Sequence, residues 1–143
     1  MGAAVSNWRL ARAVSGFGQL GVVSGTAIDL VMARRLQRGD PGGHCRRALE
    51  AFPFSDTAER ILNAYYVVGG KGERQPFKPV PMHTYEGSRR AHELTVAANF
   101  VEVYLAREGH DNPVGINYLE KIQLPHLPSL YGAMLAGVDY VIM

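Results

Sequence analysis

The chain is poor in the features that mark several large classes of protein. It has a single cysteine, Cys45, among 143 residues, which excludes an internal disulfide and a cysteine-based metal cluster. Its net charge is only +2, from 15 basic and 13 acidic residues, and gives no reason to expect a nucleic-acid partner. No apolar run approaches the roughly 18 residues that span a bilayer. We therefore expect a cytoplasmic protein with neither a membrane nor a nucleic-acid partner.

The pattern of apolar residues predicts three short strands. Leu20–Ser24 is apolar and bounded by glycines, as a strand buried on both faces should be. Val114–Tyr118 and Val138–Ile142 have the same character, and a helix-like stretch near 127–136 separates them. A strand, a crossover helix and a second strand form the unit from which parallel sheets are built. We expect the three strands to be parallel neighbours in one sheet with helices on one side.

Capping residues predict where the first two helices begin. Ser6 is expected to cap a helix that carries Trp8. Thr26, followed three residues later by Asp29, resembles a capping box that opens a second helix, which Gly39 closes.

A helical pair is predicted next, over about residues 40–68. Asp40-Pro41 has the character of a cap and first helical residue, and Asp56 with Glu59 resembles another capping box. We interpret the pair as an insertion between two strand-and-helix units.

A long loop and a long helix lead to the second strand. Residues 69–87 are rich in proline and glycine and lack a convincing period, so we predict a loop with one short strand near 78–82. Residues 88–108 place apolar side chains at helical spacing and predict the longest helix.

The first candidate site lies where the second strand ends. In parallel sheets, ligands bind at the carboxyl ends of the strands, which here means Asn117 and the loop beyond it. The amide of Asn117 suits the polar edge of a flat heterocycle such as a flavin, and equally suits a buried side chain that ties down the adjacent loop. Lys121 lies in that loop, where it either meets a substrate or faces solvent.

A histidine and a group of arginines are weaker candidates. His44 follows paired glycines, as some general bases do, but its place just inside a helix start favours a structural role. Five arginines lie on consecutive predicted helices. They form either a basic patch, which would bind nucleic acid or an acidic carrier, or a solvated surface. These residues are Arg34, Arg35, Arg38, Arg46 and Arg47. The lack of interleaved aromatic side chains favours the solvated surface.

Four segments resemble the nitronate monooxygenase family, formerly called 2-nitropropane dioxygenases. The segments are Val5–Ala11, Gly18–Thr26, Gly39–His44 and Val114–Pro125, and the likeness extends over essentially the whole chain. It is strongest to the subgroup that carries the helical insertion. That family consists of TIM-barrel FMN flavoproteins. The resemblance implies an α/β fold in which residues 1–143 are the N-terminal part of a single FMN-binding (β/α) barrel domain, a partial TIM barrel with an inserted helical pair.

The resemblance also implies a function and a set of site residues. Met1, Gly2 and Ala3 match the end of a turn whose backbone approaches FMN in the family, while Gly25 and Asn117 match strand ends beside the flavin. By the same resemblance the substrate is a small molecule, an alkyl nitronate oxidised with FMN, and Lys121 is the candidate substrate contact. The family's catalytic histidine and phosphate-binding loops match no residues here. We therefore expect no catalytic residue in the chain, and no activity from it alone.

Two alternative functions stay open. The family includes FMN-dependent enoyl reductases of fatty-acid synthesis, which would need a nicotinamide donor. The second alternative is not an enzyme: the chain would be a non-catalytic fragment that binds a partner through its basic helices. In either case the unpaired strand edges of an incomplete barrel lead us to expect an aggregation-prone chain or a homo-oligomer.

Overall fold

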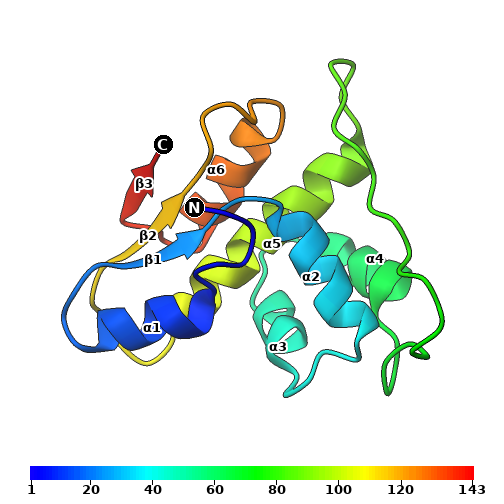
Figure 1. Ribbon diagram of the computed structural model, residues 1–143, viewed down its shortest axis with the longest axis horizontal. Coiled ribbons are helices and arrows are strands. Elements are labelled where there is room, and N and C mark those ends of the chain that lie inside the picture. Colours follow the sequence, from blue (N-terminus) through cyan, green and yellow to red (C-terminus); the bar gives the residue numbers. More distant parts are fainter.

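The computed structural model describes all residues from 1 to 143 and has a mixed α/β fold (Figure 1). Six helices accompany three short strands. In chain order the elements are α1 (Trp8–Gly16), β1 (Gly21–Ser24), α2 (Ile28–Gln37), α3 (His44–Glu50), α4 (Ser55–Tyr65), α5 (Arg89–Arg107), β2 (Val114–Asn117), α6 (His126–Leu135) and β3 (Tyr140–Ile142). The predicted helical pair corresponds to α3 and α4. No helix has both the length and the apolar character needed to cross a membrane.

The three strands form one parallel sheet in the order β1-β2-β3, which confirms the predicted pairing. In register, Val22 of β1 lies beside Gly115 of β2, which lies beside Tyr140 of β3. All three strands therefore end at the same edge of the sheet. Because β1 and β2 are adjacent there, the residues that follow them meet although they are far apart in sequence.

The two faces of the sheet differ in burial. Val23 and Ile116 lie on the face covered by α1 and α5, and both are fully buried. The opposite face carries Val22, Asn117 and Tyr140, because side chains alternate along a strand. Tyr140 is 55% exposed on that face. Helices thus cover one side of the sheet, as the sequence predicts.

The longest helix, α5, forms the centre of the core. It packs against α1, α2, α3 and α6, and its apolar side chains are almost all buried (Figure 1). At its crossing with α6, an added Cβ on Gly132 would lie 2.1 Å from the carbonyl oxygen of Val96. Only glycine permits the two helices to approach this closely.

Ser6 covers the outer edge of β1 and does not cap α1 as predicted. Its hydroxyl donates to the carbonyl of Val22 at 2.6 Å, and its carbonyl accepts from the amide of Ser24 at 2.8 Å. Asn7 caps α1 instead, since its side chain accepts from the amides of Arg9 and Leu10. The outer edge of β3 has no such covering segment, because the sheet ends with this strand.

The other predicted caps also differ from the structure. Neither α2 nor α4 has a side-chain cap, so both capping-box predictions are wrong. The hydroxyl of Thr26 donates to the carbonyl of Met1 instead, at 3.1 Å. The prediction that Pro41 is the first residue of a helix is wrong, because α3 begins at His44 with Gly43 in the N-cap position. The Asp40 carboxylate still accepts from the amides of Cys45 and Arg46 in α3. A long-range contact thus replaced the capping box predicted at Thr26.

The connection between α4 and α5 contains neither helix nor strand, so the predicted strand near 78–82 is wrong. The backbone of Lys78 forms hydrogen bonds to a side chain, whereas a strand would form them to the backbone of another strand. Its amide donates to Oε1 of Gln37 at 2.6 Å, and its carbonyl accepts from Nε2 of Gln37 at 3.2 Å. The buried Gln37 therefore holds this segment against α2 as a neighbouring strand would.

Candidate functional site

The residues that follow β1 and β2 meet at the carboxyl edge of the sheet. The amide of Gly25 donates to the carbonyl of Asn117 at 2.7 Å, which extends the pairing of the strands by one residue. Asn117 is partly buried and carries its side chain on the face away from the helices. Gly25 and Asn117, which sequence reasoning assigned to one site, are thus in direct contact.

The N-terminal residue lies on the same edge. The amine of Met1 donates to Oδ1 of Asn117 at 3.0 Å, and the carbonyl of Met1 accepts from the hydroxyl of Thr26. Gly2 and Ala3 follow it in an exposed turn. All five predicted cofactor residues therefore lie together, although 116 positions separate Met1 from Asn117.

Gly25 is a glycine because of Tyr118. A Cβ at Gly25 would lie 2.3 Å from the Tyr118 ring and 2.8 Å from the carbonyl oxygen of Asn117. The Tyr118 hydroxyl lies 2.7 Å from Oδ1 of Asn99 and 3.1 Å from the carbonyl oxygen of Ser129, so it can donate to either. Burial raises the pKa of this phenol well above its ordinary value. Tyr118 therefore fixes the strand ends against α5 and α6.

Sequence reasoning did not single out Tyr118, because it reads as one more apolar residue of a predicted strand. The signal that could have identified Tyr118 is its position just after Asn117, beside the glycine that follows the adjacent strand. A large ring opposite a glycine is a frequent way to fill a close approach, but the pairing of β1 with β2 has to be known first.

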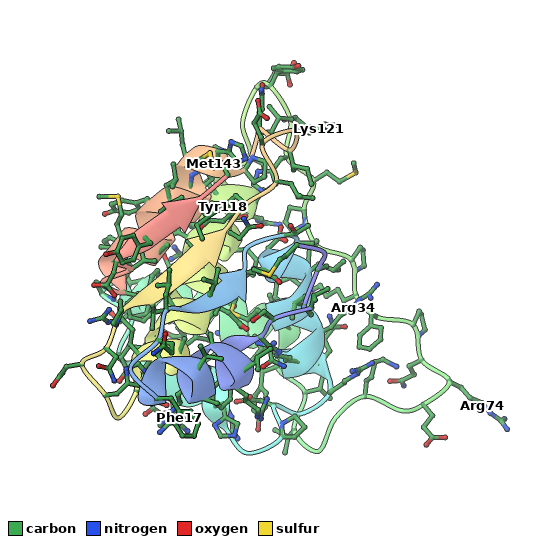
Figure 2. All side chains as sticks on the ribbon, turned by 60° about the vertical axis from the view of Figure 1, so that its left-hand side comes forward. Phe17, Arg34, Arg74, Tyr118, Lys121 and Met143 are labelled. Carbon is green, nitrogen blue, oxygen red and sulfur yellow. The ribbon has the colours of Figure 1, made fainter.

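Lys121 lies at the same end of the sheet, on the loop that follows β2 (Figure 2). It is exposed and forms neither an ion pair nor a side-chain hydrogen bond. Its neighbour Glu120 is also exposed. The structure thus leaves the ammonium of Lys121 accessible to a solute, without a direct contact to Asn117.

His44 lies far from this edge, at the start of α3. Its ring packs against Trp8, with 4.9 Å between the ring centroids, and its Nδ1 lies 3.2 Å from a nitrogen of Arg47. Burial, followed by the charges of Arg9 and Arg47, lowers its pKa. A histidine held in this way packs the junction of α1 and α3, which agrees with the predicted structural role.

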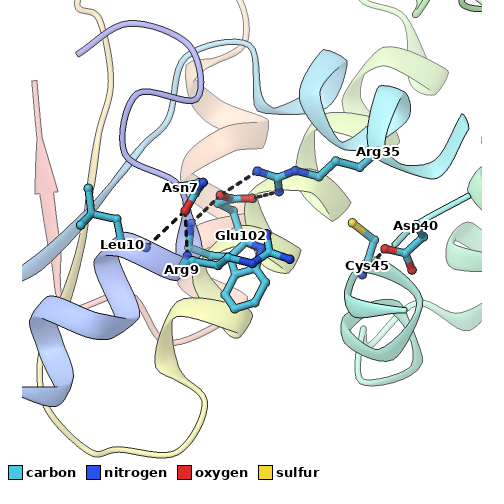
Figure 3. Close-up of polar contacts among 8 residues, drawn as sticks. Asn7, Arg9, Leu10, Arg35, Asp40, Cys45 and Glu102 are labelled. Atoms are coloured by element: carbon cyan, nitrogen blue, oxygen red, sulfur yellow. Dashed lines mark hydrogen bonds and ion pairs between the residues drawn. The ribbon is translucent and has the colours of Figure 1, made fainter. Parts of the chain in front are cut away.

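The predicted basic patch is divided by carboxylates. Arg35 pairs with Glu102 at 2.5 Å, and Glu102 also accepts from the amide of Trp8 at 2.8 Å (Figure 3). Arg46 pairs with Asp40 in the same way. A third pair joins Arg47 to Glu108. Only Arg34 and Arg38 are left without a carboxylate, and both lie over the ring of Phe77.

Cys45 is buried between α3 and its capping aspartate (Figure 3). Burial raises the pKa of its thiol to about 12, and the nearby Asp40 carboxylate adds to this effect. A thiol that stays protonated at neutral pH is a poor nucleophile and a poor metal ligand. Cys45 is therefore a core residue.

Three clefts lie away from the carboxyl edge of the sheet. The largest, about 910 Å³, lies between α4, residues 78–81 and the start of α5. A second, of about 500 Å³, lies beside Phe54 and Tyr131. A third, of about 560 Å³, lies between α1 and Gly109. Sequence reasoning predicted none of the three, because each is formed by segments that approach only after folding.

The carboxyl edge thus carries one partly buried amide, an amine, an exposed turn and a nearby ammonium. This set can form hydrogen bonds to the edge of a planar ligand and can attract an anion. Comparison with known proteins adds no assignment: no family model, curated protein or solved structure matches the chain.

Proposed function

We propose that the carboxyl edge of the sheet is the ring side of an FMN site, in an enzyme that oxidises alkyl nitronates. On this proposal the three strands are consecutive strands of a (β/α) barrel. The observation that carries it is the meeting of Met1, Gly25 and Asn117, which the resemblance to nitronate monooxygenases assigns to the cofactor. These residues come from three distant parts of the chain and lie at the end of a parallel sheet, where ligands bind in such folds.

The polar groups of this edge fit the ring of a flavin better than its phosphate. Asn117 makes one side-chain hydrogen bond, through Oδ1 to Met1, and its amide nitrogen makes none within the chain. That nitrogen is a donor of the kind that a ring carbonyl accepts. A phosphate needs several N–H donors without a nearby anion, whereas the first turn of α2, the helix start next to this edge, holds Asp29. We therefore assign only ring contacts to these residues.

The chain's own residues then have limited roles. Asn117 binds and orients the ring edge, Tyr118 holds Asn117 in place, and Lys121 attracts the anionic nitronate. Bound FMN would supply the electron acceptor for the oxidation and would pass its electrons on to dioxygen. No residue of this edge is placed to remove a proton, so we assign the chain no catalytic residue.

A titration followed by ¹⁵N NMR tests the ring contacts. Riboflavin and FMN are expected to shift the amides of Gly25 and Asn117 to the same extent, because only the ring is bound. Asn117→Ala should weaken both by about 0.5 to 1.5 kcal/mol, the usual worth of one hydrogen bond. Asn112→Ala, before the opposite end of β2, is the matched control and should change nothing. Shifts centred on other residues would contradict the proposal.

The activity is tested after joining the chain to the later half of a barrel from the nitronate monooxygenase family. Oxygen uptake with propyl 2-nitronate and no nicotinamide supports the proposed reaction, and Lys121→Gln should raise KM more than it lowers kcat. Oxidation of NADPH that depends on an enoyl thioester would favour the reductase instead. The chain alone, supplied with FMN, is expected to react no faster than free FMN.

A further inference from the structure

The largest of the three clefts described above lies among helical segments and is separate from the carboxyl edge of the sheet. It is bounded by α4, by the connection that leads toward α5, and by the first turns of α5 (Figure 1). Its volume of about 910 Å³ lies within the roughly 300 to 1,000 Å³ that is usual for small-molecule sites. Its size alone does not say what it binds, so its walls and charges have to be considered in turn.

The wall formed by residues 78–81 is fixed from two sides. Gln37 holds both backbone groups of Lys78, as described above. The ammonium of Lys78 donates to the carbonyl of Ala64 in the last turn of α4, at 3.0 Å. The segment is thus joined to α2 and α4 by three hydrogen bonds. A cleft whose irregular wall is fastened in this way exists before any ligand arrives, so binding costs little reorganisation.

The cleft carries an excess of positive charge. Four cations line it, and they are Arg60, Lys78, Arg89 and Arg90. Glu93 is its only carboxylate, and it accepts from Arg60 and Arg89 at 2.9 Å each. Arg90 is exposed and has neither an ion pair nor a side-chain hydrogen bond within the chain. The cleft therefore has a net positive charge, and one guanidinium without a partner.

The remaining lining is largely apolar. Ile61 and Leu94 form buried parts of the wall, at 5% and 2% exposure. Val80, between Pro79 and Pro81, adds a side chain that packs against the core. A small inorganic anion would leave this apolar surface in contact with water, whereas a neutral apolar molecule would leave Arg90 without a partner. A ligand that satisfies both parts of the cleft has an apolar body and one anionic group.

We propose that this cleft binds a compact organic anion, with a carboxylate or phosphate ester on an apolar body. Arg90 pairs with the anionic group, since its planar fork matches both carboxylate and phosphate oxygens. The body packs on the apolar wall formed by Pro79, Val80 and Pro81, which are exposed or only partly buried. The site is independent of the flavin site proposed above, and it uses none of the residues at the carboxyl edge of the sheet.

Four probes separate the two parts of this proposal, with binding measured by calorimetry and by NMR shifts. Phenyl phosphate and benzoate each carry both an apolar ring and an anion. Inorganic phosphate lacks the ring, and benzyl alcohol lacks the charge. We expect at least one of the first two to bind roughly tenfold more tightly than either of the last two. The stronger of these two identifies the anionic group. If neither phenyl phosphate nor benzoate binds more tightly than both inorganic phosphate and benzyl alcohol, or if the shifts lie outside the cleft, the proposal is wrong.

A pair of charge variants tests the role of Arg90. Arg90→Gln should weaken the better organic anion by roughly tenfold and leave benzyl alcohol unchanged. Arg74→Gln removes the same charge from an exposed residue of the connection between α4 and α5, outside the cleft, and this variant should bind like the unmodified chain. Both side chains are exposed, so both variants are expected to fold. If Arg90→Gln binds the anion as tightly as Arg74→Gln does, the proposed pairing is wrong.

Discussion

The two edges of the sheet are held in different ways. At the β1 edge, Ser6 pairs with the strand through both its backbone and its hydroxyl. At the β3 edge, Tyr140 is 55% exposed and Ile142 is 39% exposed, and no segment pairs with the outer side of the strand. Asp139 anchors the start of β3, because its carboxylate pairs with Arg107 and accepts from the amide of Val114. The rest of β3 depends on β2 alone.

The difference shows at which edge the backbone N–H and C=O groups find hydrogen-bond partners within the chain and at which edge they do not. On the β1 side, polar ties such as Glu102 with Arg35 and Trp8 join segments far apart in sequence. On the β3 side, unpaired N–H and C=O groups are available to another strand. We expect the β1 side to determine the stability of the folded chain, and the β3 side to determine its association.

The largest effect is expected from Glu102→Ala. Glu102 is 4% exposed, so its loss leaves the charge of Arg35 without its partner and the amide of Trp8 without its acceptor. Breaking a buried ion pair in this way costs about 3 to 5 kcal/mol of unfolding free energy. Urea titration measures the loss. Glu50→Ala, at an exposed carboxylate, should stay within about 0.5 kcal/mol, and equal losses would refute the comparison.

Ser6→Ala should loosen the β1 edge. The change removes the donor to the carbonyl of Val22 and leaves that acceptor unpaired, at a cost of about 1 to 3 kcal/mol. The backbone bond between Ser6 and Ser24 should be weakened with it. Hydrogen exchange at the Ser24 amide would then quicken relative to the amides of α5. Unchanged exchange at Ser24 would mean that the hydroxyl does not hold this edge.

Tyr140→Lys should reduce self-association. A charge on an edge strand opposes pairing with another strand, and we expect a decrease of roughly tenfold in the association constant, equivalent to about 1.4 kcal/mol. Sedimentation at several concentrations measures it. Tyr85→Lys is the matched control, because Tyr85 is 97% exposed in a loop and lies on no strand. An equal decrease for both variants would show that β3 is not the associating edge.

The smallest effect concerns pH. The hydrogen bond from Arg47 lowers the pKa of Glu108 in the folded chain. A carboxylate of lowered pKa stabilises the fold above its unfolded pKa, and this contribution is lost as the pH falls through the folded value. Between about pH 6 and pH 3, Glu108→Gln should therefore lose less stability than the unmodified chain, by under about 1 kcal/mol. Urea titrations at several pH values measure this, and an equal loss of unfolding free energy in both proteins would contradict the prediction.

Much of the sheet and of α5 could be predicted from sequence. Strands near 20–24, 114–118 and 138–142 are short apolar runs, and the period of α5 is set by its own side chains. The prediction of a strand near 78–82 failed because the partner of Lys78 is the side chain of Gln37, 41 residues away. Nothing in the local sequence distinguishes such a clamp from a strand partner.

The candidate site was predictable only in part. Asn117 follows from its place at a strand end, but its contact with Met1 depends on how the first residues cross the sheet. The cleft proposed to bind an organic anion was not predicted at all. Arg60 and Arg90 lie on different helices, and their common charge excess becomes visible only when α4 and α5 are placed side by side. The local sequence pattern thus predicts helices and strands, whereas long-range polar contacts determine the sites that form between them.

The buried state of Cys45 makes the chain a convenient host for spectroscopic labels. Its thiol has a pKa of about 12, and thiol-reactive dyes attack the thiolate, so the natural cysteine stays unlabelled at neutral pH. A second cysteine placed at an exposed position, such as Tyr140→Cys on β3, would take up the dye alone. Energy transfer between chains that carry donor and acceptor dyes would then report directly on which edge two copies share.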